Sequence, residues 1–179
     1  MKKNRGGLAV RDLCLVGLMV AVIEAFKFLM ASLPNIHLTA FWLVLFTLNF
    51  GKRSFYAVPV FVLIEGAIYG FGPWWVSYLY TWPLLVLVTL LFRKADNALF
   101  WSIVSGAFGL SFGFLCSFPY FFMGLDGGIA GGLKAAFAYW VAGINFDLIH
   151  CVANFALMLV LYTPISKVMK KANSRYFTA

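Results

Sequence analysis

The chain has 179 residues, of which 63% are hydrophobic and 11% are charged, and its mean hydropathy is +0.91. A soluble domain is about 45–50% apolar and about 25% charged, so this composition excludes an ordinary soluble enzyme and a disordered chain. The formal charge of +8 is compatible with a nucleic-acid surface, but the positions of the charges favour a membrane protein. Three cysteines lie in apolar segments without disulfide or metal spacing, namely Cys14, Cys116 and Cys151.

Long apolar segments define the expected fold. A helix needs about 20 apolar residues to cross a bilayer, and six segments approach this length, at 9–33, 36–50, 54–72, 74–92, 98–123 and 138–163. We therefore predict an all-α membrane protein, a single six-helix domain over residues 1–179. The second segment is short, so we expect it to be tilted or packed on its neighbours. Glycine-rich residues 124–134 are expected to form a loop.

The basic residues lie on one side of this six-helix arrangement. All 14 Lys and Arg residues except Lys27 and Lys134 lie before or at the start of the first segment, or follow the second, fourth or sixth. Cytoplasmic loops of membrane proteins are enriched in Lys and Arg. The pattern predicts that both termini are cytoplasmic.

The sixth segment carries polar residues at helical spacing. Trp140, Gly143, Asp147, His150 and Asn154 recur every three or four residues and share one helix face. Lipid would reject this face, so we expect it to point into the bundle. Either Asp147, His150 and Asn154 contact a polar solute with Trp140 stacking on it, or the face forms hydrogen bonds that only fix helix packing.

Three further charged residues fall inside apolar segments, namely Glu24, Lys27 and Glu65. Glu24 and Lys27 are three residues apart and can neutralise each other. Lys27 is also a candidate partner for Glu65 across the bundle. Glu65, Asp147 and His150 have side chains that bind metals, but no motif supports such a site and we predict none.

Aromatic residues gather near the expected turn after the third segment, where Trp74 and Trp75 follow Gly72-Pro73 and precede Tyr78. They form either an interfacial aromatic belt or the walls of a pocket for a flat ligand. Asn35 and His37 are expected to reach the same outer end. The predicted solute-binding residues are therefore Asn35, His37, Trp74, Trp75, Tyr78, Trp140, Asp147, His150 and Asn154.

Small residues mark a different face of the first segment. Gly17, Ala21 and Ala25 are spaced by four, which allows a partner helix to approach closely. The sequence contains no G-x-x-x-x-G-K-[ST], H-E-x-x-H or G-x-S-x-G motif. We therefore expect neither an enzyme nor a bound cofactor.

The chain resembles the substrate-binding S component of energy-coupling factor (ECF) transporters, the bacterial vitamin-uptake class of ABC transporters. The resemblance covers nearly the whole chain. It rests on the Gly17-x-x-x-Ala21-x-x-x-Ala25 face and on the runs Phe71-Gly72-Pro73-Trp74-Trp75 and 143–151. It implies a protein of the bacterial cytoplasmic membrane whose first helix contacts a membrane coupling subunit that carries two cytoplasmic ATPases. It also implies an outward pocket formed by the loop after the first helix and the outer parts of helices four to six.

The fold of this family does not identify the vitamin. The many Trp and Tyr residues suit a large, flat, partly apolar ligand, which favours cobalamin; a pyridoxine or hydroxymethylpyrimidine type is the nearest alternative. Two other functions compete with this one. One is an autonomous ion-coupled carrier that uses Glu24, Glu65 and Asp147, and the other is a membrane enzyme with Asp147 and His150 as an acid–base pair.

Overall fold

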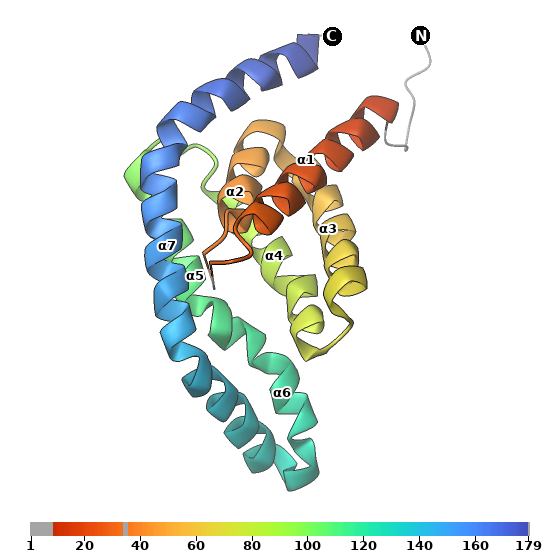
Figure 1. The fold of residues 1–179 in the computed structure, drawn as a ribbon, viewed down its shortest axis with the longest axis vertical. Helices are drawn as coiled ribbons and strands as arrows, with labels where there is room; N and C mark the ends of the chain where they lie inside the picture. Colours follow the sequence, from red (N-terminus) through yellow and green to blue (C-terminus); the bar gives the residue numbers. More distant parts are fainter. Residues whose placement is uncertain (1–8, 34–35, 179) are drawn as a thin grey trace.

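The computed structural model describes residues 9–33 and 36–178, and within these ranges the chain is helical without any strand (Figure 1). The all-helical class predicted from the sequence is confirmed. The elements in chain order are α1 (Val10–Leu29), α2 (Thr39–Phe50), η1 (Gly51–Arg53), α3 (Ser54–Tyr69), α4 (Pro73–Leu91), α5 (Ala98–Cys116), α6 (Phe118–Met123), η2 (Leu125–Gly127) and α7 (Gly128–Thr178).

Local sequence signals set several of the helix ends. Pro73 begins α4, where its missing N–H costs no helical hydrogen bond. The side chain of Asn97 caps α5 by accepting a hydrogen bond from the N–H of Leu99 at 2.8 Å. Gly51 and Gly70 end α2 and α3 with φ angles of 62° and 89°, which favour glycine.

Helix α2 is the central element of the core. Its consecutive residues Leu43, Val44 and Leu45 have no exposed surface, and the helix packs against α1, α3, α4 and α7. Twelve residues extend about 18 Å, less than the hydrocarbon thickness of a bilayer. The expectation that this short segment packs on its neighbours is confirmed.

Helix α7 differs most from the sequence-based expectation. It has 51 residues, begins at Gly128 and continues beyond residue 163, so most of the expected loop at 124–134 is helical. Glycines there serve close packing on α6, because a Cβ at Gly124 would lie 2.8 Å from the Gly131 carbonyl and one at Gly132 would lie 2.7 Å from the Phe121 carbonyl. The expected helix at 98–123 is likewise divided at Ser117 into α5 and α6.

Within the described residues, three helical stretches are long and apolar enough to cross a membrane, namely Pro73–Leu91, Ala98–Met123 and Leu125–Tyr176. The structure therefore supports the membrane character predicted from composition to the extent of these three candidate membrane-spanning helices. Helices α2 and α3 are shorter, with 12 and 16 residues. Helix α1 has 20 residues but includes Asp12, Glu24 and Lys27.

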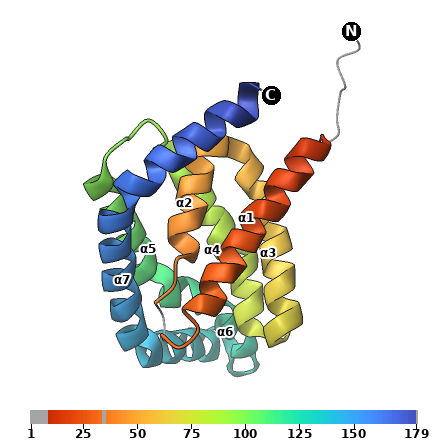
Figure 2. The same cartoon turned by 45° about the horizontal axis from the view of Figure 1, so that its top comes forward.

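Helix α7 runs beside α5 along one side of the molecule, and its curved C-terminal part crosses the end of α2 towards the start of α1 (Figures 1 and 2). Pro164 lies inside α7, and a proline favours a bend because it lacks the N–H of the regular helix. This arrangement brings the two ends of the described chain to one end of the molecule.

Candidate functional site

The polar stripe of α7 faces the interior, as its spacing predicted. Asp147, His150 and Asn154 are 4%, 3% and 4% exposed. Oδ1 of Asp147 accepts a hydrogen bond from the N–H of Gly113 on α5 at 2.9 Å, and Nδ2 of Asn154 donates one to the Ser105 carbonyl at 3.3 Å. These bonds tie α7 to α5, so the stripe contributes to helix packing.

Glycines on α5 allow this close approach. A Cβ at Gly109 would lie 2.8 Å from the carbonyl of His150, and a Cβ at Gly113 would overlap the carboxylate of Asp147. The backbone of α5 therefore reaches polar groups of α7 that any larger residue would push away.

Two histidines from distant parts of the chain meet beside this contact. His37 lies in the segment between α1 and α2, and its ring centroid is 4.8 Å from that of His150 and 6.4 Å from that of Trp82. The ring centroid of Phe112 on α5 lies 5.0 Å from that of His150. The loop before α2 and helices α4, α5 and α7 thus converge on one buried point.

Several polar atoms at this point and at the neighbouring contact between Gly113 and Asp147 lack hydrogen-bond partners. Within the described residues, Asp147 Oδ2, His150 Nε2, His37 Nδ1 and Trp82 Nε1 are buried and make no hydrogen bond. Leaving a buried polar group unpaired costs about 1–3 kcal/mol. A polar solute or water that supplies partners there would therefore be held favourably.

Aromatic residues of α4 lead from its N-terminus to the histidines. The rings of Trp74 and Tyr78 lie 5.2 Å apart and those of Tyr78 and Trp82 lie 5.4 Å apart, both edge to face. Trp75 points elsewhere, because its Nε1 donates a hydrogen bond to the Val62 carbonyl of α3 at 2.8 Å. Trp75 therefore joins α3 to α4.

The remaining predicted residues divide between the site and its surroundings. The ring centroids of Trp140 and Phe114 lie 5.6 Å apart, and the Trp140 side chain also lies beside the Asp147 carboxylate. Asn35 lies outside the described residues. The structure brings together His37 and His150, and Trp82 connects Tyr78 to them. Asp147 lies three residues before His150 on α7, at the contact with Gly113.

Trp82 and Phe112 lie beside the two histidines and were not among the predicted residues. Trp82 is 1% exposed and follows Trp74 and Tyr78 at intervals of four. That helical spacing is a signal in the sequence from which Trp82 could have been found.

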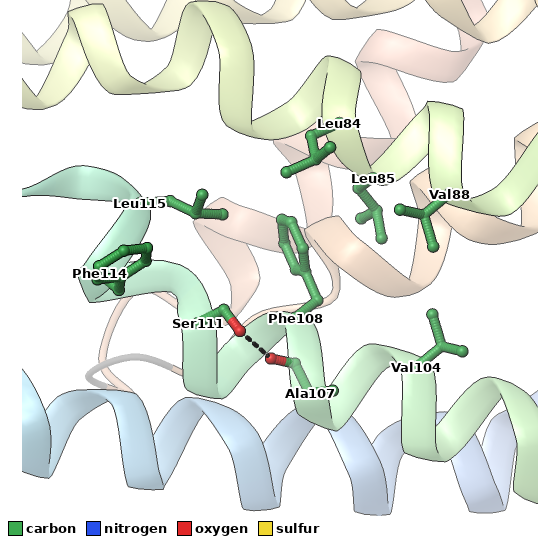
Figure 3. Close-up of a pocket in the computed structure, with 9 residues that line it drawn as sticks. All are labelled: Leu84, Leu85, Val88, Val104, Ala107, Phe108, Ser111, Phe114 and Leu115. Carbon is green, nitrogen blue, oxygen red and sulfur yellow. Dashed lines mark hydrogen bonds between the residues drawn. The ribbon is translucent and has the colours of Figure 1, made fainter. Parts of the chain in front are cut away.

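Two grooves differ in what they offer a ligand. A groove of about 390 Å³ between α5 and α7 is lined by Phe112, Gly113, Cys116, Tyr139, Ala142, Gly143, Phe146 and Asp147. A second groove of about 450 Å³, between α4 and α5 (Figure 3), has Ser111 as the only polar side chain in its lining, and that hydroxyl donates to the Ala107 carbonyl at 2.8 Å. The first groove alone of these two presents a carboxylate that can orient a solute.

A charged cluster lies between α1 and α3. Lys27 Nζ forms an ion pair with Glu65 and lies over the rings of Phe61 and Tyr78 at 5.4 and 6.0 Å from their centroids. The pairing of Lys27 with Glu65 across the bundle is confirmed. Glu24 also lies within electrostatic reach of both charges.

Basic segments that are far apart in the sequence meet at one end of the molecule. Asp12 of α1 pairs with Arg53 at 2.6 Å and accepts a hydrogen bond from the hydroxyl of Tyr176 near the end of α7. Arg11 lies 4.4 Å from the centroid of the Tyr176 ring.

A second contact at this end involves the turn between α4 and α5. Asp96 accepts hydrogen bonds from Lys170 at 2.6 Å and from the hydroxyl of Tyr162 at 3.0 Å. The bond from Lys170, followed by that from Tyr162, lowers the pKa of the Asp96 carboxyl. The contacts with Asp12 and Asp96 therefore hold the C-terminal part of α7 against α1 and against the turn between α4 and α5.

The small-residue face of α1 is not covered by any part of the chain that the structure describes. Gly17, Ala21 and Ala25 are exposed, and a Cβ at Gly17 would meet nothing within 4 Å.

Within residues 9–33 and 36–178, no group of three or more His, Cys, Asp or Glu side chains is arranged to hold a metal ion. Comparison with known protein families, curated proteins and solved structures found no match to this chain.

Proposed function

We propose that this protein is the solute-binding S component of an ECF transporter and that its solute is a vitamin. The proposal rests first on buried, unpartnered polar atoms. Those of His37 and His150 meet among aromatic side chains, and that of Asp147 lies three residues before His150 on the same face of α7. Binding sites for small molecules combine apolar walls with a few polar groups that orient the ligand.

The proposed topology has six membrane-spanning segments and cytoplasmic termini in a bacterial cytoplasmic membrane. Its support is the distribution of charge, because Arg11, Arg53 and Lys170 lie at the end of the molecule where α1 begins and α7 ends. Basic residues favour the cytoplasmic side. The short helix α2 is buried in the bundle, so its length does not have to match the bilayer.

The proposed partners are a membrane coupling subunit and two cytoplasmic ATPases. Gly17, Ala21 and Ala25 are exposed on α1, while Glu24 and Lys27 on the same helix contact groups inside the bundle. Helix α1 can therefore dock a partner helix on one face and remain anchored to the bundle by the other.

The aromatic composition and the volume of the groove favour different vitamins as the solute. The abundance of Trp and Tyr favours cobalamin, whose corrin ring is large and flat. The groove beside Asp147 has a volume of about 390 Å³, near the lower end of the range of small-molecule sites. This volume favours the smaller pyridoxine or hydroxymethylpyrimidine type.

The proposal is tested by purifying the chain alone under mild conditions and identifying the retained solute by mass spectrometry. Cobalamin, pyridoxine and hydroxymethylpyrimidine are then titrated onto the empty protein. We expect one of them to bind, and we expect uptake into vesicles only when the coupling subunit and ATPases are present with ATP. Sustained uptake by the chain alone would instead support the ion-coupled carrier, which the buried carboxyl groups of Glu24 and Glu65 favour.

A further inference from the structure

Three ionisable side chains lie together between α1 and α3, beside Tyr78 and apart from the contact between Gly113 and Asp147. Glu24 is 9% exposed, Glu65 is 1% exposed, and Lys27 pairs with Glu65. Two carboxylates and one ammonium group leave one excess negative charge in a region shielded from water. Such a charge is unfavourable unless a partner neutralises it.

The two carboxyl groups also have unsatisfied oxygens. Oε1 of Glu24 and Oε1 of Glu65 are buried and have no hydrogen-bond partner in the described part of the chain, although the two groups lie close enough to hydrogen-bond to each other. Ionised carboxylates only accept hydrogen bonds. The two carboxyl groups therefore lack a hydrogen-bond donor between them.

The surroundings do not supply a second positive charge. Lys27 faces the rings of Phe61 and Tyr69 of α3 and of Tyr78 of α4. His37, from the segment before α2, is a further titratable group within electrostatic reach of Lys27. Lys27 is thus the only Lys or Arg that the described residues place in an ion pair with this cluster.

We propose that Glu24 and Glu65 share one bound proton, held between their facing carboxyl groups. The proton adds to an oxygen of one carboxylate and is donated in a hydrogen bond to the other, so the cluster with Lys27 becomes neutral. A metal cation is a poorer occupant because it would need more oxygen ligands and would be repelled by the ammonium group of Lys27. The inference does not depend on which solute the protein binds.

Infrared spectroscopy of the purified full chain at neutral pH tests the proposal. We expect a carbonyl stretch from a protonated carboxylic acid that is lost in Glu24→Gln. The control is Asp96→Asn, which removes a carboxyl group already bonded to Lys170 and Tyr162 and should leave the band unchanged. If Glu24→Gln does not fold, Glu65→Gln provides the same comparison.

Thermal unfolding gives a second measurement. Glutamine resembles the protonated carboxyl group, so Glu24→Gln should fold, and its melting temperature should fall less than that of the wild type as the pH rises from neutral to alkaline. Absence of the infrared band from folded wild-type protein would overturn the proposal. A band that sodium ions abolish at constant pH would also overturn it, in favour of a cation site.

Discussion

The backbone N–H of Gly113 on α5 donates a hydrogen bond to Oδ1 of Asp147 on α7 at 2.9 Å. The contact requires glycine, because a Cβ at position 113 would occupy the space of the carboxylate. One oxygen of Asp147 is thereby fixed by the backbone of α5, while Oδ2 is left without a hydrogen-bond partner among the described residues. The same residue can therefore join two helices and present an oxygen to a solute.

Replacing Gly113 with alanine should destabilise the protein. The added methyl group must displace Asp147, and overpacking of this kind costs about 1–3 kcal/mol. Thermal unfolding in detergent measures the loss. Gly143→Ala is the matched control, because a Cβ at Gly143 meets nothing within 4 Å; equal melting temperatures for the two variants would contradict the packing described here.

Asp147→Ala and His150→Ala should each weaken solute binding while leaving assembly with the partner subunits intact. Each removes a buried polar group that we assign to the solute, worth about 1–3 kcal/mol, or roughly 5- to 150-fold in affinity. Mass spectrometry of the retained solute, followed by titration, measures the effect.

The control for these two variants is Ser111→Ala, which removes a hydroxyl bonded only to the Ala107 carbonyl of its own helix. Unchanged affinity in both Asp147→Ala and His150→Ala would show that the α7 stripe serves helix packing alone.

The sequence predicted those parts of the site that depend on helical spacing or on charge. The positions of Asp147, His150 and Asn154 on one buried face follow from their intervals, since lipid excludes polar groups. The same reasoning offered Glu24 and Glu65 as partners of Lys27, because an isolated buried charge needs a partner, and the structure pairs Lys27 with Glu65.

Features that depend on tertiary contacts could not be predicted in the same way. Glycines such as Gly124 and Gly132 occur both in loops and where helices pack closely, and only the contact with α6 distinguishes the two uses. The role of Trp75 likewise depends on the Val62 carbonyl of another helix, which no local pattern reveals.

Lys27→Met should destabilise the protein strongly. Removing one member of a buried ion pair leaves the other charge uncompensated, which costs about 3–5 kcal/mol. The double variant Lys27→Met, Glu65→Gln should recover part of this loss in thermal unfolding, because it removes the stranded charge.

Lys170→Met is the matched control for this pair. Its contact with Asp96 is exposed, with 58% and 63% of the two side chains accessible, so we expect a change below about 1 kcal/mol. A double variant less stable than Lys27→Met alone would contradict the role of Glu65 as the stranded charge.

Ala21→Leu should block assembly while solute binding remains close to wild type. The larger side chain projects from the exposed face formed with Gly17 and Ala25, and close helix–helix packing does not tolerate that extra volume. Co-purification with the coupling subunit and ATPases measures assembly, and titration measures binding. Ala156→Leu adds the same volume at an exposed position of α7 and should have no effect on either. If Ala21→Leu lost solute binding together with assembly, α1 would not separate a docking face from an inner anchoring face, and the proposed division of this helix would be wrong.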